Sequence, residues 1–435
     1  MPTRRAFLST TPLVALSMLR ASTEPAQSKP GVRPEPVQSA PRTGSESAQS
    51  ASRVGSESTL NETRGAAGTA GGFDPWVEIN AENLRHNVGE IARRAGGRPI
   101  LGVIKNNGYG LGVANVGRLL DGDARLAGFA VVKLHEAMTL RDAGIKKPIL
   151  LMGPFDDAQL VDLAARDIMA MVYRDHGAAL DRAAAKTGRP VPLHVKIDTG
   201  MGRVGIPHDE AAGLLKDLAA RRSARLEGVM TTLTEDEAFD REQLKRFAAL
   251  AGDLKRDGVR VGRLHAASSF ALFQNADAYL DMVRPGMAIF GVYSEPPFRQ
   301  LGAMDLRPAV ALRTRVALVK QLQAGESAGY NRAYIAKAPV WIATLPVGHA
   351  DGWPRVAAKG AKVRIGAALY PVIASVSASH TILEIGSQQT VQVGDVATLF
   401  DWNDGSRPED VAAACGASVY DLTMHLGALL PRRIV

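Results

Sequence analysis

The chain has 435 residues, of which 46% are hydrophobic, and its formal net charge is +8 from 52 basic and 44 acidic side chains. This length allows two domains, or one barrel with an addition, and the composition is that of an ordinary globular protein. No basic block is interleaved with aromatic residues, which argues against a nucleic-acid-binding protein. Cys415 is the only cysteine and no His-Glu-x-x-His motif occurs, so we expect neither a disulfide nor a metal site of the usual spacing.

The first residues are typical of an export signal. Two adjacent arginines, Arg4 and Arg5, precede a mildly apolar stretch that is short and rich in Ser and Thr. We predict a twin-arginine-type signal over residues 1–21 and no stable membrane span. This route carries folded proteins, and the implied destination is the periplasm. Residues 22–73 have almost no large apolar side chains, so they cannot offset the entropy of ordering, and we predict a disordered linker there.

Between residues 74 and 305, apolar runs alternate with amphipathic segments. The runs predict eight strands, at residues 99–105, 128–132, 148–153, 169–173, 192–198, 226–231, 263–268 and 282–291. Apolar residues at helical spacing predict helices at 113–120, 134–144, 158–166, 177–187, 209–222 and 241–257. A doubly wound open sheet would give a similar pattern, but a count of eight favours a parallel β/α barrel.

From residue 306 onward, short β-like runs are separated by Gly, Asp and Asn. Strands are expected at residues 310–322, 341–346, 361–365, 370–376, 381–385 and 391–400, followed by a helix at 420–430. Residues 75–79 are a candidate extra strand for this region. The predicted fold class is therefore α/β, with a parallel, TIM-like β/α barrel over residues 74–305 and a mostly β C-terminal domain over 306–435.

Lys105 is the first candidate for chemistry. It ends a buried strand-like run and opens the glycine-rich segment 105–112, where a charge is costly to bury. Burial lowers the pKa of an amine and makes it a nucleophile. A lone strand-end lysine would more often reach solvent, but the Tyr109 hydroxyl could meet a phosphate, and the glycines allow a ligand to approach the backbone. These neighbours favour a cofactor-binding lysine.

Other polar residues fall at the carboxyl ends of the predicted strands, where reacting groups collect in a barrel. Arg203, on the glycine turn after residues 192–198, could hold a carboxylate or a phenolate oxygen, and a structural ion pair is an equal alternative for this segment alone. His265 and Ser269 could serve a phosphate, although each alone is more often a satisfied polar group. Arg284 precedes a turn whose backbone amides could cradle the same phosphate.

Five segments carry motifs in a fixed order. Residues 105–112 read Lys-Asn-Asn-Gly-Tyr-Gly-Leu-Gly, residues 196–205 read Lys-Ile-Asp-Thr-Gly-Met-Gly-Arg-Val-Gly, and residues 284–291 read Arg-Pro-Gly-Met-Ala-Ile-Phe-Gly. Residues 329–334 and 346–352 read Gly-Tyr-Asn-Arg-Ala-Tyr and Pro-Val-Gly-His-Ala-Asp-Gly. Together they resemble the motifs of the alanine racemase family, pyridoxal-phosphate enzymes built from a β/α barrel and a β domain. The resemblance covers residues 75–435.

The resemblance implies a pyridoxal 5'-phosphate-dependent amino-acid racemase that interconverts L- and D-amino acids by two-base proton transfer, as a homodimer with shared active sites. It implies that Lys105 holds the cofactor covalently and is the base on one face of the substrate, and that Tyr330 of the partner subunit is the base on the other. Arg284 would face the ring nitrogen. Arg203, oriented by Lys196, would bind the phenolic oxygen of the cofactor and the substrate carboxylate. The implied phosphate ligands are Tyr109, Ser269, Gly286, Met287 and Tyr420.

Three departures from the family pattern concern the substrate side. Thr232 stands where the family often has a histidine that contacts the catalytic tyrosine. Ala378 and Ser379 replace a Met-Asp or Met-Asn pair near the substrate, and His349 replaces the tyrosine of the entryway. Smaller groups predict a roomier pocket, with Ala378 as a substrate-binding residue and a substrate range beyond alanine.

Three alternatives stay open on the sequence alone. A related pyridoxal-phosphate lyase or decarboxylase would tend to differ at the ring nitrogen or to carry a metal site, and Arg284 argues against the former. A non-enzymatic pyridoxal-phosphate carrier would lack the β domain. An exported pseudoenzyme is allowed by Thr232 and by the Ala378–Ser379 pair.

Overall fold

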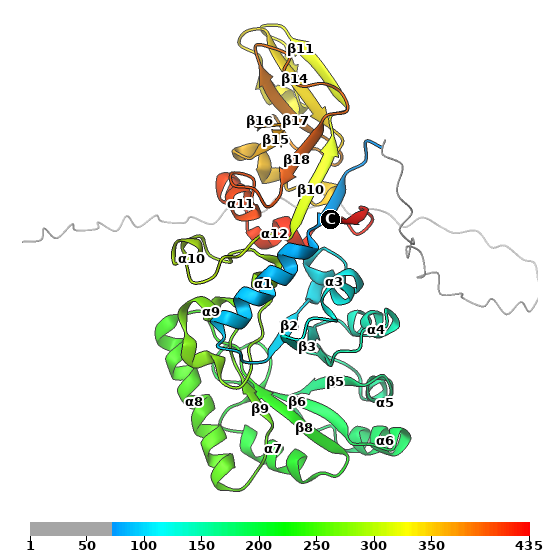
Figure 1. Cartoon of the computed structure of the whole chain (residues 1–435), viewed down its shortest axis with the longest axis vertical. Coiled ribbons are helices and arrows are strands. Elements are labelled where there is room, and N and C mark those ends of the chain that lie inside the picture. The colour runs from blue at the N-terminus through cyan, green and yellow to red at the C-terminus, as the bar shows by residue number, and fades with distance from the viewer. Residues whose placement is uncertain (1–71) are drawn as a thin grey trace, which may run out of the picture. The chain divides into compact units, whose positions relative to one another are not determined.

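The computed structural model describes residues 72–435, so the predicted signal at 1–21 and nearly all of the predicted linker at 22–73 lie outside the described residues. Two large sheets organise the described part, one parallel and the other mostly antiparallel (Figure 1). Within residues 72–435, no helix has the length and apolar character needed to cross a membrane.

The parallel sheet forms the barrel, with the strand order β2-β3-β4-β5-β6-β8-β9 and β7 paired beside β6. Its strands are β2 (Ile100–Val103), β3 (Leu126–Val131), β4 (Ile149–Leu151), β5 (Ile168–Val172), β6 (Val191–Asp198), β7 (Ile206–Pro207), β8 (Ala224–Met230) and β9 (Arg263–His265). β2 and β4 are buried along their whole length, as expected of parallel strands covered on both faces. The predicted barrel is therefore confirmed.

An eighth extended segment, residues 281–285, closes the barrel between β2 and β9. Its hydrogen bonds run from Leu101 N to Val283 O (2.9 Å), from Val103 N to Pro285 O (2.8 Å), from Arg284 N to Ala267 O (2.8 Å) and from Asp281 N to Leu264 O (3.0 Å). The predicted strand at 282–291 is wrong in its second half, where η3 (Met287–Phe290) is a 3-10 helix. Pro285 has no amide to donate, and the Ser269 hydroxyl accepts the amide of Gly286, so the chain leaves the ladder here.

Helices cover the outside of the barrel, with α3 to α6 on one side in Figure 1. They are α1 (Ala81–Arg94), α2 (Lys105–Tyr109), α3 (Val113–Leu120), α4 (Leu134–Asp142), η1 (Asp157–Gln159), α5 (Leu160–Ala165), α6 (Gly177–Thr187), α7 (Ala211–Ala220), α8 (Glu237–Arg256), α9 (Ser269–Gln274), η2 (Ala276–Tyr279) and α10 (Pro296–Gln300). The predicted helices at 113–120 and 177–187 have the bounds of α3 and α6. No helix was predicted at α1, α2, α9 or α10.

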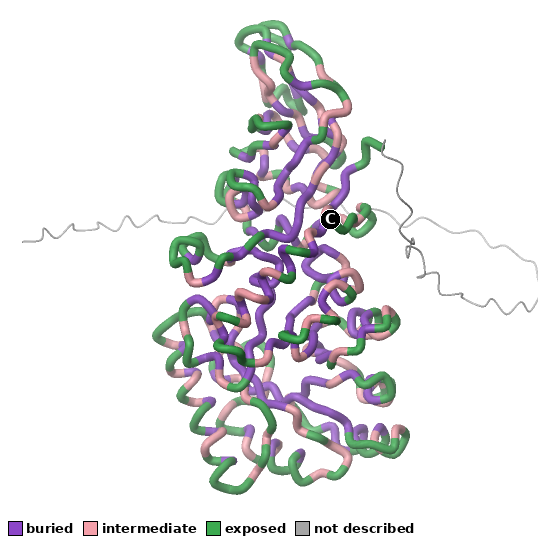
Figure 2. The backbone as a smooth tube through the Cα atoms, viewed as in Figure 1, coloured by how far each residue is buried: buried purple, intermediate pink, exposed green. Residues whose placement is uncertain are grey.

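Burial follows this layering, with buried strands inside and exposed outer faces on the helices (Figure 2). One core cluster lies between the strands and the helices and continues into the second sheet. A smaller cluster fills the barrel interior and consists of Leu101, Val103, Ala130, Leu150, Met171, Met230 and Met282. Because the interior is packed, a ligand site is expected at an end of the barrel and not along its axis.

The second large sheet has the order β11-β14-β17-β16-β15-β18-β10-β1-β19. Its elements are β1 (Trp76–Ile79), β10 (Val310–Arg315), β11 (Leu318–Leu322), β14 (Val340–Leu345), β15 (Lys362–Ile365), β16 (Ala368–Ile373), β17 (Thr381–Gly386), β18 (Val396–Phe400) and β19 (Arg432–Ile434). Beside it lie the pair β12 (Ser327–Ala328) and β13 (Tyr334–Ile335), the 3-10 helices η4 (Tyr330–Arg332), η5 (His349–Asp351) and η6 (Arg355–Lys359), and the helices α11 (Pro408–Cys415) and α12 (Val419–Met424). The predicted extra strand at 75–79 is confirmed, because β1 pairs with β10.

Three predictions for this domain need correction. The strand expected at 391–400 begins only at Val396, because the preceding residues form a turn in which Gln392 N donates to Asp395 Oδ2 at 2.8 Å. The strand expected at 310–322 is two strands, because Val316 N donates to Asp395 O while Ala317 N donates to Thr344 O, so the chain changes partners between them. The helix expected at 420–430 ends at Met424. Beyond it, the Arg432 guanidinium takes the carbonyl oxygens that a longer helix would use, including Gly427 O at 2.8 Å.

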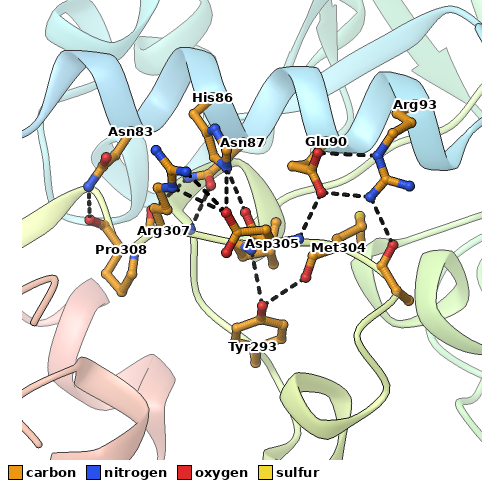
Figure 3. Close-up of polar contacts among 12 residues, drawn as sticks. Asn83, His86, Asn87, Glu90, Arg93, Tyr293, Met304, Asp305, Arg307 and Pro308 are labelled. Carbon is orange, nitrogen blue, oxygen red and sulfur yellow. Dashed lines mark hydrogen bonds and ion pairs between the residues drawn. The ribbon is translucent and has the colours of Figure 1, made fainter. Parts of the chain in front are cut away.

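The connector between the two sheets is held against α1 (Figure 3). Asn87 accepts from Arg307 N at 2.8 Å and donates to Arg307 O at 2.8 Å, and Glu90 accepts from Asp305 N at 2.7 Å. Tyr293 donates its hydroxyl to Met304 O at 2.8 Å. These bonds tie residues 304–308 to the barrel over several consecutive positions.

Candidate active site

Lys105 begins a left-handed turn at the carboxyl end of β2. The five residues after it have positive φ angles: Asn106 at 53°, Asn107 at 56°, Gly108 at 62°, Tyr109 at 51° and Gly110 at 89°. This conformation costs energy for every residue except glycine, so the run must be held by its surroundings. Asn107 N donates to Glu136 Oε1 at 2.7 Å, and Asn107 Oδ1 accepts from Val113 N at 3.1 Å.

The Lys105 amine is half-buried and lies in a positive field. Burial lowers its pKa, the Arg203 charge lowers it further, and the Glu136 carboxylate opposes both effects. A lysine with a depressed pKa has a larger neutral fraction at neutral pH, and the neutral amine is the nucleophilic form. The environment therefore suits covalent attachment of a carbonyl compound.

The predicted phosphate ligands gather around one glycine. A Cβ atom placed on Gly286 would lie 2.2 Å from Tyr109 Oη, so only glycine leaves room for that hydroxyl. Ser269 Oγ accepts from Gly286 N at 2.9 Å, and Met287 opens the 3-10 helix that follows. Burial, and then the neighbouring Tyr420 phenol, raise the pKa of Tyr109, so its hydroxyl stays protonated.

Tyr420 joins this cradle from α12. Its pKa is raised to about 12, first by burial and then by Glu235 and Glu295. Protonated phenols, a serine hydroxyl and backbone amides are all able to donate to anionic oxygens. The donor set therefore fits a phosphate group, and the Gly286 backbone supplies the close approach.

Replacing Gly286 with alanine tests this cradle. The added methyl group would overlap Tyr109 Oη, and we expect the Kd for pyridoxal phosphate to rise by about tenfold to a hundredfold, as for overpacked sites that cost about 1–3 kcal/mol. Gly213→Ala is the matched control, because a Cβ on Gly213 would meet nothing within 4 Å. Equal Kd values for wild type and Gly286→Ala would exclude this cradle as the phosphate site.

Arg284 is buried at the carboxyl end of the closing segment, behind the cradle. Its Nη1 donates to His265 Nδ1 (3.1 Å) and His265 O (2.7 Å), and its Nη2 donates to Thr231 O (2.7 Å). Its Nε makes no hydrogen bond within residues 72–435. Burial lowers the pKa of this guanidinium to about 10, so it is still charged at neutral pH. One N–H is thus available to a ring nitrogen, and a guanidinium donates only.

The structure corrects the phosphate role considered for His265. That side chain is fully buried and bonded to Arg284, and its Nε2 lies 2.9 Å from His194 Nδ1. Burial, then Arg284 and Arg263, lower the pKa of His194 to about 3, and burial also lowers the pKa of His265. Both rings are therefore neutral, and their function in the fold is to hold the Arg284 guanidinium in place.

Arg203 is exposed on the turn that follows β6, and its charge lowers the pKa of both Lys105 and Lys196. Within residues 72–435 it forms no ion pair, so the structural ion pair left open by the sequence is not observed. Lys196 is buried, and burial lowers its pKa first, followed by Arg284 and Arg203. Its Nζ lies 2.6 Å from Thr232 Oγ1.

Sequence reasoning missed the buried residues of α8 that hold the loops after β6 and β8. Gln243 donates to Thr199 Oγ1 at 3.1 Å and to Thr232 O at 3.1 Å, while its Oε1 accepts from Thr234 N at 2.9 Å. Asp240 Oδ1 accepts from the same amide at 2.9 Å. These side chains link the Arg203 turn to the Thr232 loop. No motif pointed to them, because their role depends on burial and not on their residue type.

Tyr330 and Ala378 are not brought to this site in a single chain. Tyr330 lies in η4 with 73% of its surface exposed. Ala378 O accepts from Ala350 N at 3.0 Å, and Ser377 O accepts from His349 N at 3.0 Å. The predicted substrate-side residues Ala378 and His349 thus belong to one wall of the β domain. No hydrogen bond or ion pair of the described residues joins this wall to Lys105.

Comparison with known proteins places the chain in a family. The model of the alanine racemase N-terminal domain matches residues 79–294, and that of the C-terminal domain matches residues 309–434. The chain belongs to the alanine racemase family. Members of this family depend on pyridoxal phosphate, and the chain is accordingly a pyridoxal-phosphate-dependent isomerase of the amino-acid racemase type. The lyase, decarboxylase and pseudoenzyme alternatives are not favoured.

Individual relatives agree with this assignment. The chain is 33% identical to an alanine racemase of Desulforamulus reducens, over 82% of this chain and 98% of the relative. It is 32% identical to alanine racemase 2 of Caldanaerobacter subterraneus, over 82% of this chain and 93% of the relative. Its fold matches the crystal structure of an alanine racemase from Streptomyces lavendulae with a TM-score of 0.78 and 28% identity, covering 84% of this chain and 98% of that one. The crystal structure of the alanine racemase from Bacillus anthracis with bound L-Ala-P matches with a TM-score of 0.75 and 30% identity. This match covers 84% of this chain and 96% of that one.

Proposed function

We propose that Lys105 and Tyr330 are the two bases of an amino-acid racemase, acting on opposite faces of the substrate. When bound, pyridoxal phosphate supplies a ring that accepts the electrons left behind when the α-hydrogen departs as a proton. Lys105 is suited to remove or return that proton from one face, because its pKa is depressed and its turn is fixed. The observation that carries the proposal is the convergence of this lysine with the phosphate cradle around Gly286.

Arg284 is proposed to face the ring nitrogen through its Nε–H. Since a guanidinium keeps its proton, a nitrogen placed against it stays unprotonated. This arrangement limits electron withdrawal and favours simple proton return over side reactions. Arg203 is proposed to bind the substrate carboxylate and the phenolic oxygen of the cofactor, because its charge acts directly on Lys105.

We further propose that the enzyme is a homodimer with shared active sites. Tyr330 is exposed, and it lies on a strained turn where Gly329, Asn331 and Arg332 all have positive φ. Such strain marks a position that is held for function. In this proposal, a second copy of the chain brings this tyrosine to the Lys105 site.

The proposed substrate range extends beyond alanine. Gly348 packs so closely on the wall that a Cβ there would lie 2.4 Å from Ala378 O, so the segments carrying His349 and Ala378 lie directly against each other, and Ala378 contributes only a methyl group. An apolar pocket discriminates between substrates that differ by one methylene by only about 1–3 kcal/mol. Smaller side chains on the pocket wall therefore readily broaden the range of amino acids that the enzyme accepts.

To test the range, kcat/KM should be compared for alanine, serine, lysine, arginine and methionine. We expect several of these to be turned over at comparable efficiency, and Ala378→Met to narrow the range towards alanine. A lead for alanine of more than roughly a thousandfold over all others, beyond what one such contact gives, would mean a dedicated alanine racemase.

Export to the periplasm is proposed from the paired arginines Arg4 and Arg5. Fractionation of cells expressing the full chain should find racemase activity in the periplasm, and an Arg4→Lys/Arg5→Lys double variant should retain it in the cytoplasm. If wild type and the double variant show the same distribution of activity between periplasm and cytoplasm, these arginines do not direct export.

A further inference from the structure

A buried carboxylate outside the predicted site touches the Lys105 turn. Glu136 lies in the first turn of α4, and only 2% of its surface is exposed. An isolated buried carboxylate is costly unless hydrogen bonds satisfy it, so its partners indicate what it is for.

All of its hydrogen bonds come from backbone amides. Its Oε2 accepts from Lys133 N at 3.0 Å and from Val132 N at 3.3 Å, which is the usual reach of such a residue back to the start of its own helix. Its Oε1 accepts from Asn107 N at 2.7 Å, across 29 residues of sequence. Helix capping explains the hydrogen bonds of Oε2 but not the hydrogen bond of Oε1 to Asn107.

The Oε1 atom of Glu136 accepts a hydrogen bond from a strained segment of backbone. Asn107 is the second of five consecutive residues with positive φ, and three of the five, Asn106, Asn107 and Tyr109, are not glycine. Residues held in this region cost energy and persist only where the surroundings fix them. The Glu136–Asn107 bond is a charge-assisted bond in a buried setting, which is among the stronger kinds.

We propose that Glu136 is a positioning residue for Lys105. Its carboxylate clamps the left-handed turn through Asn107 and thereby fixes where the Lys105 amine and the Tyr109 hydroxyl lie on either side of that turn. The same carboxylate places a negative charge near an amine on which the positive charge of Arg203 also acts. This inference rests on the cofactor-binding role proposed for Lys105.

The test compares Glu136→Gln with wild type in the cofactor-free protein. Glutamine keeps the size of the side chain but offers one carbonyl oxygen to three amide donors, so at least one bond is lost along with the charge. We expect faster hydrogen–deuterium exchange in residues 105–112 and a Kd for pyridoxal phosphate raised by about tenfold, as for loss of a buried hydrogen bond to a charged group.

A second readout separates the clamp from simple folding effects. The pH profile for acetylation of the Lys105 amine, followed by mass spectrometry with Lys147 as internal reference, should move to lower pH in Glu136→Gln because the stabilising carboxylate is gone. Glu136→Asp keeps the charge and shortens the reach, so it should leave that profile in place while weakening cofactor binding. If Glu136→Gln does not fold, Glu136→Asp takes its place in the measurements of hydrogen–deuterium exchange and cofactor Kd.

Glu409→Gln is the matched control. Glu409 is another largely buried first-turn carboxylate, on α11, and it bonds to Arg407 and not to the Lys105 turn. It should leave exchange at 105–112 and cofactor affinity unchanged. Wild-type exchange and wild-type Kd in both Glu136 variants would overturn the proposal and leave Glu136 as a cap of α4. Failure of wild type itself to bind the cofactor through Lys105 would instead overturn the proposed function.

Discussion

Replacing Lys105 with alanine should remove both racemase activity and covalent binding of the cofactor. The amine is half-buried with a depressed pKa, and Lys196, the other lysine close to Arg203, is buried and bonded to Thr232. We therefore expect that Lys196 does not substitute for it. Because the change removes the attachment point and one of the two bases, we expect turnover to fall by more than about 10⁴-fold, the upper range for one acid–base group.

The measurement is the absorbance of covalently held cofactor in purified protein, together with chiral analysis of the product from single L-amino acids. Borohydride reduction followed by peptide mapping should place the cofactor on Lys105 in wild type. Lys147→Ala is a suitable control, since its Nζ donates to Leu126 O at 2.8 Å in another part of the barrel. A Lys105→Ala enzyme that kept both the absorbance band and turnover would rule out the assignment.

The barrel was predictable because its local patterns and its global fold agree. Mostly apolar runs predicted the seven parallel strands, and apolar residues at helical spacing predicted most of the helices between them. Failures occurred where tertiary contacts override local preference. Residues 282–291 are mostly apolar apart from Arg284, yet Pro285 and the Ser269 hydroxyl turn the second half into a 3-10 helix. Likewise, residues 426–430 are apolar but do not continue α12, because the Arg432 guanidinium donates to the carbonyl oxygens of Leu426, Gly427, Ala428 and Leu430.

The site was predictable where a residue type carries the chemistry. A lysine, a tyrosine and glycines on one turn favour a phosphate-bearing cofactor over a lysine that merely reaches solvent. The supporting residues were hidden for the opposite reason. Gln243 and Asp240 hold the loops after β6 and β8 only because α8 buries them there. The position of Glu136, three residues after Lys133, is typical of a residue that caps the start of a helix. Its hydrogen bond to Asn107 was not predictable, because the two residues are 29 positions apart and meet only in the folded chain.

Replacing Tyr330 with phenylalanine should cost about 10²–10⁴-fold in racemisation, the range for loss of one acid–base group, while cofactor binding stays normal. The residue is 73% exposed in one chain, so removal of its hydroxyl leaves the fold of that chain intact. Tyr334→Phe is the matched control four residues away, because the Tyr334 hydroxyl bonds to Glu384 at 2.8 Å instead of being free for substrate. Activity of Tyr330→Phe equal to wild type would exclude the hydroxyl as a base.

Mixing two inactive variants tests whether this tyrosine works in the site of a second copy. If each site combines Lys105 of one chain with Tyr330 of another, a dimer of one Lys105→Ala chain and one Tyr330→Phe chain has one doubly defective site and one intact site. Random reassembly of equal amounts should then restore about a quarter of wild-type activity, because half of the dimers are mixed and each has one working site of two. Sites built within single chains would each carry one defect, and the mixture would stay inactive. Recovery of activity on mixing would thus place the two proposed bases on different chains.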